Sequence, residues 1–496
     1  VGDCKAETAR ALDNQSLRGL MRRSTTLDAD GRRVLVSNDF GDYAILCAAD
    51  HSDLLADRIF ASHPKHVDLE ARALLDSSPK EHWSDLEHAA YATRKAFALE
   101  GPSLHIFVVT LRCDHSCHYC QVSRAAVGAT GFDMRQADAD AAVDLVFQSP
   151  SNDLTIEFQG GEPALRFDLV RRIVERAEAR NMDAGRRLTF AMVSTLHHLT
   201  EDDLIFCRDH SIRLSTSIDG PAEWHDAHRP NPTRDSWERT IAALGRARAI
   251  LGDDGISALP TLTRRSMTDP RKLIDHYRDL GFPSIFLRPI SPYGFALKTR
   301  KKVGFLAFYV EALEYILALN AAGEQFEETY ASILLRHMLT PFHSGYLDLR
   351  SPAGAGLGVL VYNYDGQVYP ADEARMAAET GDDRFALGRV TDTFETLMSS
   401  PAMRWLASGS VAEVLPGCET CAFVPYCGAD PVYHAAAQGD PIGNRETSDH
   451  CIRHTFMFSL LFNKLADADA STMTTFLAWA LSKSRDEIVA PGHIDR

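Results

Sequence analysis

The fold of this protein is decided by the stretch Leu104-His-Ile-Phe-Val-Val-Thr-Leu-Arg-Cys113-Asp-His-Ser-Cys117-His-Tyr-Cys120. It opens with an apolar run typical of a buried strand, and three cysteines follow at once on a short loop. Three thiolates on one loop can hold three irons of a cubane cluster and leave the fourth iron open to a small molecule. The alternative is a structural zinc site in which His115 or His118 supplies the fourth ligand.

Apolar strand-like runs alternate with amphipathic helical runs downstream of residue 104. The predicted strands are Leu104–Thr110, Leu154–Gln159, Leu188–Ser194, Ile212–Ile218, Ile256–Leu262 and Ser284–Pro289. The predicted helices are Met134–Gln148, Phe167–Ala179, Glu201–Asp209, Trp237–Leu251 and Pro270–Leu280. This alternation predicts an α/β fold with a parallel sheet and right-handed crossovers, a partial (β/α)6 TIM-like barrel. Ligands in such folds bind beyond the carboxyl ends of the strands, so we expect the loops there to form the site.

The remaining sequence divides into further units. Residues 1–100 contain a predicted hairpin, Arg33–Ser37 and Tyr43–Leu46, followed by helices, and are typical of an α+β accessory domain. We expect the barrel at 101–300, a helical bridge at 301–345 and a C-terminal extension at 346–496. The bridge should hold helices Val303–Ala321 and Phe326–Leu339. The extension should hold a hairpin, Gly358–Tyr362 with Gln367–Pro370, then a helix His454–Ala466 and a polar tail.

Composition limits the classes of partner. The protein has 496 residues, with 52 Lys+Arg against 68 Asp+Glu, and a net charge of −16. Such an acidic protein repels phosphate backbones, so we expect no nucleic acid partner. No apolar run is long enough to span a bilayer and no secretory signal is visible, so we expect no membrane partner and a cytoplasmic location. Ten cysteines in a cytoplasmic protein indicate metal binding or catalysis rather than disulfides.

The spacing of Cys113, Cys117 and Cys120 after the first strand resembles the radical S-adenosylmethionine (SAM) enzymes. The second strand ends in Gln159-Gly160-Gly161-Glu162-Pro163, which is similar to the motif that holds the SAM amino group in that family. Taken alone, this motif also fits a helix-start turn. The resemblance implies a [4Fe-4S] cluster with an open iron for SAM, and it places Tyr119 beside the adenine.

Further SAM contacts are implied by the same resemblance. Ser194 ends the third strand, where the family places hydroxyls near the ribose. The fourth strand leads through Ser217 and Asp219 to Arg229, similar to a segment that contacts the SAM ribose and carboxylate in relatives acting on peptides. Each of these residues alone also fits a capping or surface role. Arg288, on the sixth strand, faces the same mouth or forms a surface ion pair.

A second cysteine group contains Cys418, Cys421, Cys427 and Cys451. Four thiolates at such spacing fit a zinc ribbon. After a radical SAM core, they resemble the SPASM domain, which implies one auxiliary [4Fe-4S] cluster with full ligation that passes electrons. The ligand positions of that domain's other auxiliary cluster correspond here to Ala353, Ala371 and Pro431, which cannot bind iron. We therefore expect one auxiliary cluster rather than two.

One carboxylate stands out as a catalytic candidate. In sulfatase-maturing relatives, an acid at the position of Asp372 takes a proton from the substrate, with Glu373 as the alternative here. A carboxylate after a hairpin can also be merely exposed. A general base must reach its proton geometrically, so the structure has to decide between the two roles.

The segments Gln121-Val-Ser-Arg124 and Tyr362-Asn-Tyr-Asp-Gly-Gln-Val-Tyr-Pro-Ala-Asp372 resemble the His-Xaa-Ser system radical SAM maturases. The resemblance implies modification of a ribosomally synthesised precursor peptide by hydrogen abstraction with a 5′-deoxyadenosyl radical. It also implies an external electron donor such as a flavodoxin or ferredoxin. We expect a carbon–carbon cross-link between side chains, of the cyclophane type. Peptide oxidation or epimerisation, and a radical SAM reaction on a small molecule or carbohydrate, are the alternatives.

An alternative from another class is a non-catalytic Fe–S or zinc scaffold, which would not cleave SAM. Residues 1–100 weigh toward a peptide substrate, since an extended leader segment could add to a sheet edge there. The same residues could instead form a structural cap on the barrel.

Overall fold

The structure is a computed structural model that describes residues 22–75, 85–299 and 304–489. Cys4 and the expected helix start at Val303 therefore lie outside the described residues. Within the described ranges, no helix is both long enough and apolar enough to cross a membrane.

A parallel sheet forms the centre of the molecule. Its strands are β4 (Leu104–Thr110), β7 (Asp153–Gly160), β8 (Arg187–Val193), β9 (Ile212–Ser217) and β10 (Ile256–Leu259). Neighbours in sequence are also neighbours in the sheet, in the order β10-β9-β8-β7-β4. In the sheet Ile106 pairs with Glu157, and Glu157 pairs with Ala191. Because side chains alternate along a strand, these paired residues, and every second residue along each strand, point to the same face. The predicted parallel strand–helix fold is confirmed.

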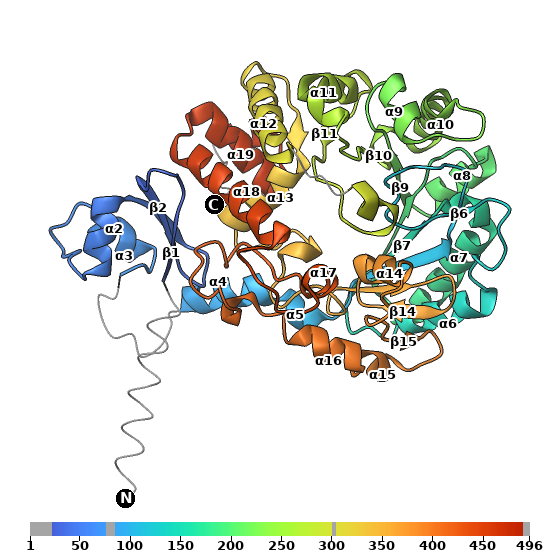
Figure 1. Cartoon of the computed structure of the whole chain (residues 1–496), viewed down its shortest axis with the longest axis horizontal. Helices are drawn as coiled ribbons and strands as arrows, with labels where there is room; N and C mark the ends of the chain where they lie inside the picture. Colours follow the sequence, from blue (N-terminus) through green and yellow to red (C-terminus); the bar gives the residue numbers. More distant parts are fainter. Residues whose placement is uncertain (1–21, 76–84, 300–303, 490–496) are drawn as a thin grey trace, which may run out of the picture.

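The five predicted crossover helices are present and cover one face of this sheet, from the top of Figure 1 (α11) down its right side (α6). They are α6 (Gln136–Val146), α7 (Phe167–Ala184), α8 (Glu201–Asp209), α10 (Ser236–Leu251) and α11 (Pro270–Asp279). The core between helices and strands includes fully buried Phe107, Phe158 and Met192. Local signals fix helix ends: Thr200 and Asp203 form a capping box at the start of α8, and Gly185 ends α7 at φ 63°.

The sixth strand is shorter than the sequence predicts. Only β11 (Ser284–Ile285) is regular, and it pairs with β12 (Glu327–Glu328) rather than with β10. An isolated bridge between Leu262 and Pro289 links this segment to the end of β10. Proline has no backbone N–H to donate, so Pro289 cannot extend a ladder. The barrel therefore stays open on this side.

The central sheet continues beyond the barrel on its other side. Strand β13 (Val359–Tyr362) lies parallel to β4, and β14 (Gln367–Tyr369) and β15 (Gly388–Arg389) follow antiparallel. His105 Nδ1 lies 2.9 Å from the Tyr362 hydroxyl across the β4–β13 junction. An eight-stranded sheet thus joins the expected barrel to the expected C-terminal extension. The division of the protein into four units stays a prediction.

A helical layer closes the other end of the molecule. It contains α12 (Phe305–Ala321), α13 (Thr329–Leu339), α18 (Asp449–Ala466) and α19 (Ala470–Leu481). The expected polar tail is wrong, because α19 is a helix that packs against α13. Asp469 caps α19, and its Ser/Thr-rich sequence conceals an apolar stripe in which Phe476 and Trp479 are buried.

The shorter elements complete the fold. Near the N-terminus they are α2 (Ala48–Leu55), α3 (His66–Ala71), α4 (Asp85–Lys95), α5 (Phe97–Glu100), β5 (Arg112–Cys113) and β6 (Ala125–Ala126). Later ones are α9 (Ala222–His228), α14 (Asp372–Ala378), α15 (Phe394–Met398), α16 (Pro401–Ala407), α17 (Pro431–Gln438) and α20 (Arg485–Val489).

The N-terminal sheet consists of β1 (Arg23–Thr26), β2 (Arg33–Ser37) and β3 (Tyr43–Cys47), all antiparallel. It has a small apolar core of its own. The sheet lies against the second cysteine group, not against the barrel strands (Figure 1). The Ser37 hydroxyl donates to the Ala422 carbonyl at 2.7 Å, and the Ala422 N–H donates to Thr25 Oγ1 at 2.9 Å. Whether residues 1–100 dock a peptide or form a structural cap stays a prediction.

Candidate functional site

The first cysteine group follows β4 directly. Cys113 ends β5 and is 8% exposed, while Cys117 and Cys120 are half-buried. Burial raises the pKa of the Cys113 thiol, and the neighbouring Glu162 and Cys117 add to this shift. Burial likewise raises the pKa of Cys117, where Cys120 is a further contributor. The three thiols therefore lie within electrostatic range of one another.

The two glycines after β7 let that strand end press against the cysteine loop. A Cβ at Gly160, whose φ is +135°, would lie 2.0 Å from the Thr110 carbonyl oxygen. A Cβ at Gly161 would lie 2.4 Å from the Arg112 carbonyl oxygen. Because these obstacles are backbone atoms, no side-chain movement can relieve them. The Gly-Gly-Glu-Pro motif therefore packs in register with the cysteine loop.

Glu162 joins the ends of β7 and β8. It is fully buried, and its side chain accepts hydrogen bonds from the Ser194 hydroxyl at 2.7 Å and the Thr195 N–H at 2.6 Å. It also caps the turn that begins at Pro163, accepting from the Ala164 N–H at 3.0 Å. Both carboxylate oxygens thus accept hydrogen bonds from the protein. These bonds hold the Gly-Gly-Glu-Pro motif in a fixed position beside the cysteines.

Asp219 organises the segment after β9. Its Oδ2 accepts from Arg229 Nε at 3.1 Å and from the Tyr119 hydroxyl, and its Oδ1 accepts from the Thr261 N–H at 2.9 Å. Burial alone would raise the pKa of Asp219, but Arg229 and the other partners hold it below its ordinary value. Arg229 also lies over the Tyr119 ring, 5.5 Å from its centroid. The three predicted SAM contacts Tyr119, Asp219 and Arg229 are thus brought together, and Asp219 is saturated by protein partners.

Several hydroxyls near the same strand ends have no partner. Thr195 Oγ1, Ser215 Oγ and Thr216 Oγ1 are buried without a hydrogen bond among the described residues. Ser217 lies two residues after Ser215 on β9 and so on the same face. Buried polar groups normally have partners, so the orphaned hydroxyls of Thr195 and Ser215 fit a polar ligand bound beyond the strands, whereas Thr216 lies on the opposite face of β9 with the buried Ile212 and Leu214.

A buried histidine cluster lies behind the cysteine loop. Asp114 lies 2.8 Å from His115 Nδ1, 3.0 Å from His198 Nε2 and 3.7 Å from His197 Nδ1. Burial would raise the pKa of Asp114, but these histidines lower it far below its ordinary value. His197 and His198 lie in the loop after β8, and the His197 side chain is fully buried against Asp114.

This cluster continues toward the segment after β9. His115 Nε2 lies 2.8 Å from Ser236 Oγ, which lies 3.0 Å from His225 Nε2. His225 Nδ1 in turn lies 3.4 Å from the Asp219 N–H nitrogen. A series of hydrogen bonds therefore connects the cysteine loop to Asp219. Sequence reasoning missed this series because its members come from separate loops.

The histidines that could make the first group a zinc site have other partners. Both ring nitrogens of His115 are used by Asp114 and Ser236, and His118 Nε2 lies 3.1 Å from the Ala227 carbonyl. Cys113, Asp114 and His115 do place ligand atoms within 4.8 Å of one another. That group leaves out the other two cysteines, so the donor set suits a three-thiolate cluster better than zinc.

The second cysteine group gathers four thiols. Burial raises the pKa of Cys427 well above its ordinary value, and Cys418, Cys421 and Cys451 each raise it further. All four thiols therefore lie within electrostatic range of one another, which is compatible with a four-thiolate ligand set. His450 is buried beside them; its ring nitrogens form no hydrogen bond among the described residues, and its Nδ1 lies 3.7 Å from Asp430 Oδ2. Its ligand atom, with those of Cys427 and His454, falls within 4.8 Å, so a mixed zinc set stays an alternative here.

Between the two cysteine groups lies a cavity of about 340 Å³, named here the acidic cavity. Its lining includes Ala353, Ala371 and Pro431, the three positions that lack a cysteine, and the carboxylate of Asp372. Asp372 pairs with the buried Arg375 at 3.0 Å. Glu373 also lines the cavity, and burial, with further contributions from Asp348 and Asp372, raises its pKa to about 8. Both candidate proton acceptors thus face enclosed space.

The acidic cavity adjoins the glycine motif through β7. Glu157 and Gln159 line it, and the same strand continues into Gly160 and Gly161. Arg288 also lines it, as the sequence predicts for the mouth of the sheet. The cavity therefore opens beside the predicted SAM contacts.

The Radical SAM superfamily model matches residues 107–274, which hold the cysteine loop, the glycine motif and β4 to α11. Residues 107–274 form a radical SAM domain. The protein is also 29% identical over 132 residues to an uncharacterized protein of Methanocaldococcus jannaschii. That match covers 27% of this protein and 43% of the relative, so it spans less than half of the curated relative.

Solved structures share the fold of this radical SAM domain and its surroundings. Native anSMEcpe with bound AdoMet has a TM-score of 0.61 at 18% identity, covering 73% of this protein and 98% of that one. Native anSMEcpe with bound AdoMet and Cp18Cys peptide has a TM-score of 0.60 at 17% identity, covering 73% and 97%. Streptococcus suis SuiB bound to precursor peptide SuiA has a TM-score of 0.51 at 12% identity, covering 87% and 98%. At these identities the likeness concerns the fold.

The residues present fit the cofactors of a radical SAM domain. The thiols of Cys113, Cys117 and Cys120 suit a [4Fe-4S] cluster with one open iron. The orphaned hydroxyls of Thr195 and Ser215 are available to the polar groups of SAM. Thr195 belongs with Ser194 to the hydroxyls expected at the end of the third strand, Ser215 adds to the predicted Ser217, and the lack of hydrogen-bond partners could not be seen in the sequence.

Proposed function

We propose that this protein is a radical SAM enzyme that modifies a ribosomally synthesised precursor peptide. The observation that carries the proposal is the packing of the three-cysteine loop against Gly160 and Gly161, directly beside the acidic cavity. Bound together, a reduced [4Fe-4S] cluster and SAM supply a 5′-deoxyadenosyl radical that removes a hydrogen atom from an unactivated C–H bond. Structural likeness to enzymes crystallised with peptides supports a peptide as the substrate.

Residues of the radical SAM domain have distinct roles in this proposal. Cys113, Cys117 and Cys120 hold the cluster. The backbone of Gly160, Gly161 and Pro163, with Glu162 fixing its position, receives the SAM amino group, and Tyr119 lies beside the adenine. Ser194, Ser217 and Arg229 take the ribose and carboxylate. Asp219 acts as a positioning residue for Arg229 and Tyr119, because both of its oxygens already accept from protein donors.

The second cysteine group holds one auxiliary [4Fe-4S] cluster through Cys418, Cys421, Cys427 and Cys451. The clustering of these thiols supports four-thiolate ligation, and the lining of the acidic cavity by Ala353, Ala371 and Pro431 supports a single cluster. Two clusters would give about eight irons per protein molecule. An iron count near about twelve would contradict the single auxiliary cluster, and about four irons with equimolar zinc would support the zinc ribbon.

The bond that we propose is a carbon–carbon cross-link between side chains, as in the His-Xaa-Ser system maturases that the sequence resembles. Cross-linking removes two hydrogens: the first leaves as a hydrogen atom to the 5′-deoxyadenosyl radical, and the second leaves as a proton, which a carboxylate beside the substrate would accept, and an electron, which the auxiliary cluster would accept. Asp372 is the acceptor predicted by the sequence, and Glu373 is the alternative with a pKa of about 8, nearer to a working pH. Oxidation needs the same acceptor, and epimerisation is the remaining alternative.

The experiment is co-expression with a short adjacent open reading frame, followed by mass spectrometry of the peptide. Loss of the mass of two hydrogen atoms, with a new bond between side chains in fragment spectra, supports the cross-link. The same loss without a new bond supports oxidation. An unchanged mass with inverted chirality supports epimerisation.

A scaffold without catalysis makes the opposite prediction for SAM. The reduced holoenzyme should form 5′-deoxyadenosine, and replacing Cys113, Cys117 and Cys120 by Ala should abolish its formation. No 5′-deoxyadenosine from the wild-type holoenzyme, or equal amounts from the variant, would contradict the enzyme proposal.

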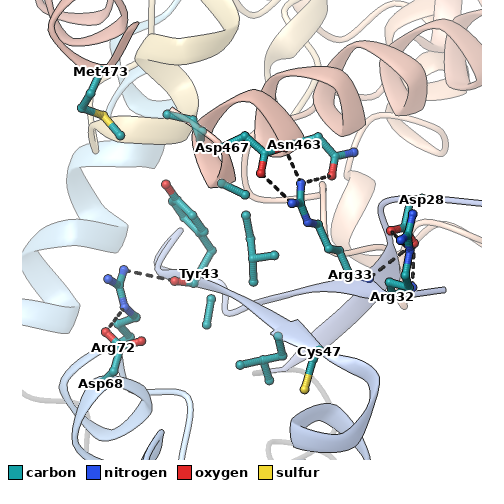
Figure 2. A pocket seen from close by; sticks show the side chains of 15 residues that line it. Asp28, Arg32, Arg33, Tyr43, Cys47, Asp68, Arg72, Asn463, Asp467 and Met473 are labelled. Carbon is teal, nitrogen blue, oxygen red and sulfur yellow. Dashed lines mark hydrogen bonds and ion pairs between the residues drawn. The ribbon is translucent and has the colours of Figure 1, made fainter. Parts of the chain in front are cut away.

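We also propose that the leader segment of the precursor docks along β3. Among the described strands β3 pairs with β2 alone, so its other edge is open to a further strand, although Arg72 already donates to the Tyr43 carbonyl at 3.1 Å. A groove of about 880 Å³ follows this edge, lined by Ala44–Cys47 and, on the opposite wall, by Asp467 and Met473 (Figure 2). Arg33 holds the two walls together through Asp467 at 2.6 Å.

Deletion of residues 1–95 should abolish binding of the labelled precursor, measured by fluorescence anisotropy. Because the deletion also removes contacts to the second cysteine group, a point variant is needed. Met473→Arg places a bulky charge in the groove and should weaken binding while the iron content stays unchanged. Met182→Arg is the matched control, since Met182 is 87% exposed on α7. Undiminished binding by both the deletion and Met473→Arg would argue for a structural role of the N-terminal sheet.

A further inference from the structure

The acidic cavity has an unbalanced set of charges. Its lining contains one guanidinium, that of Arg288, and five carboxylates: Glu157, Asp348, Asp372, Glu373 and Asp430. Its volume of about 340 Å³ is sufficient for a long side chain. An enclosed lining with this excess of acid is unfavourable unless cations or protons neutralise it.

Partners inside the protein account for only some of these carboxylates. Asp372 is neutralised by Arg375, and Asp430 caps α17 by accepting from the Tyr433 N–H at 2.9 Å. By contrast, Asp348 and Glu373 form no ion pair with another described residue. Arg288, the cation of the cavity, donates to the Tyr346 hydroxyl at 3.4 Å and forms no described ion pair either. These two carboxylates of the cavity thus form no ion pair within the described ranges, although the Arg288 guanidinium lies within electrostatic range of both, since Tyr346 and each of them raise its pKa.

A buried phenol adds a second polar group without a partner. Tyr293 is 4% exposed, and its hydroxyl has no hydrogen bond within the described part of the protein. Burial raises the pKa of Tyr293 well above its ordinary value, and Asp430, Glu373 and Asp348 of the cavity raise it further. The hydroxyl therefore lies within electrostatic range of the cavity carboxylates, although Tyr293 is not itself among the residues that line the cavity.

We infer that the acidic cavity binds a basic side chain, lysine or arginine, of the substrate peptide. An ammonium or guanidinium there would pair with Asp348 and Glu373 and donate to the Tyr293 hydroxyl. This inference rests on the proposed function and names the chemistry of the substrate at the same site. It explains why the lining keeps more carboxylates than Arg288 and the Asp372–Arg375 pair neutralise.

The position of the cavity explains how a cation bound there would help to position the substrate for the reaction. Glu157 and Gln159 line the cavity, and β7 then continues into Gly160 and Gly161 at the proposed SAM site. A side chain anchored in the cavity would hold its own or a neighbouring carbon at a fixed distance from that site. Fixing the reacting atoms in this way is a large part of catalysis on unactivated bonds.

The raised pKa values of two cavity carboxyls agree with a bound cation as their partner. Burial raises the pKa of Glu373 to about 8, with Asp348 and Asp372 as further causes, and raises that of Asp430 to about 7, with Asp348 next. A bound cation favours the ionised form of both carboxyls and so displaces protons near neutral pH. The geometry of the unpaired carboxylates carries the inference, and this shift supports it.

The test compares two peptides that differ in one charge. Acetyl-Gly-Ala-Lys-Ala-Gly amide and its norleucine counterpart are titrated into the anaerobic holoenzyme with SAM, using calorimetry. We expect the lysine peptide to bind about tenfold more tightly, a difference of about 1.4 kcal/mol. Equal affinities of the two peptides for the wild-type protein would overturn the inference, whatever the variants do.

Variants locate the preference within the protein. Asp348→Asn combined with Glu373→Gln should reduce the preference for lysine to less than about twofold, with iron content and circular dichroism as folding controls. Glu175→Gln is the matched control, since Glu175 is exposed on α7, and it should keep the full preference. A preference that survives the double variant would also overturn the inference.

The proposed function is measured separately, from 5′-deoxyadenosine formed by the same holoenzyme without peptide. Formation of 5′-deoxyadenosine without any lysine preference would refute only the basic side chain. A lysine preference without 5′-deoxyadenosine would refute the enzyme and leave a basic-peptide site.

Discussion

The two cysteine groups are built on opposite plans. The first offers three thiols on one loop. This loop packs against Gly160 and Gly161 and lies near the orphaned hydroxyls of Thr195 and Ser215. The second gathers four thiols from a loop and a helix, and the N-terminal sheet covers it through bonds to Ala422. A ligand set that leaves one position open needs space and polar partners for a ligand, whereas a complete set needs only enclosure. The surroundings of each group therefore carry as much information as its cysteine count.

The largest difference should appear when one cysteine of each group is removed. Cys117→Ala should reduce 5′-deoxyadenosine formation to background, because it removes a ligand of the cluster that binds SAM. Cys421→Ala should keep 5′-deoxyadenosine formation and lose the modified peptide. Chromatography of the nucleoside and mass spectrometry of the peptide measure the two outcomes. Loss of 5′-deoxyadenosine in both variants, with normal iron at the first group, would show that the groups do not differ in this way.

Residues that support the first cysteine group should tolerate substitution less well than exposed residues nearby. Asp219→Asn removes the charge partner of the buried Arg229, so the free energy of unfolding should fall by about 3–5 kcal/mol. The KM for SAM should rise as well, because Arg229 and Tyr119 lose their common acceptor. Denaturant unfolding and steady-state kinetics test both effects. Asp209→Asn, at the exposed end of α8, is the control and should change neither.

Adding a methyl group should be harmful at Gly161, which packs against the cysteine loop, and harmless at a glycine inside a helix. Gly161→Ala places a Cβ 2.4 Å from two carbonyl oxygens, so we expect a loss of about 1–3 kcal/mol in stability and less iron at the first group. Gly245→Ala on α10 meets nothing within 4 Å and should stabilise the protein by about 0.5–1 kcal/mol. Iron assay and thermal unfolding distinguish them. Full iron occupancy in Gly161→Ala would mean that the loop does not depend on this contact.

The smallest effect concerns pH and the cavity between the two groups. Because burial raises the pKa of Glu373 to about 8, the folded state holds its proton more tightly than the unfolded state does. The resulting stabilisation is complete below the ordinary value of 4.5 and is lost as the pH rises through about 8. Glu373→Gln should therefore raise the melting temperature at about pH 9 and change it little at about pH 5. An equal shift at both pH values would point to packing instead.

The sequence predicts the regular parts of the fold well. The expected strand Leu104–Thr110 and helix Glu201–Asp209 match β4 and α8, because their apolar periods and end signals are local. The strand expected to end at Pro289 is longer than β11, since its pairing depends on distant partners. Helix α19 is missed by the sequence prediction because Ser and Thr residues conceal its apolar stripe.

The candidate site, like the fold, has parts that local sequence predicts and parts that depend on residues far apart in the sequence. Cysteines and glycines carry their spacing in the sequence, so their neighbourhood could be predicted. The hydrogen-bond series from Asp114 through His115 and Ser236 could not, because separate loops supply it. Similarly, the sequence indicates that Ala353 and Ala371 lack thiols, but not that carboxylates such as Asp348 line the space beside them.

The pairing of β13 with β4 has a mechanical consequence. Because the hairpin after residue 358 supplies the neighbour of the first barrel strand, the radical SAM domain has no complete edge of its own on that side. A shortened protein that ends before β13 would present the N–H and C=O groups of β4, and the apolar side chains of Ile106 and Val108, to solvent. Such an edge recruits other strands, so the truncated protein should aggregate rather than act as a free-standing domain.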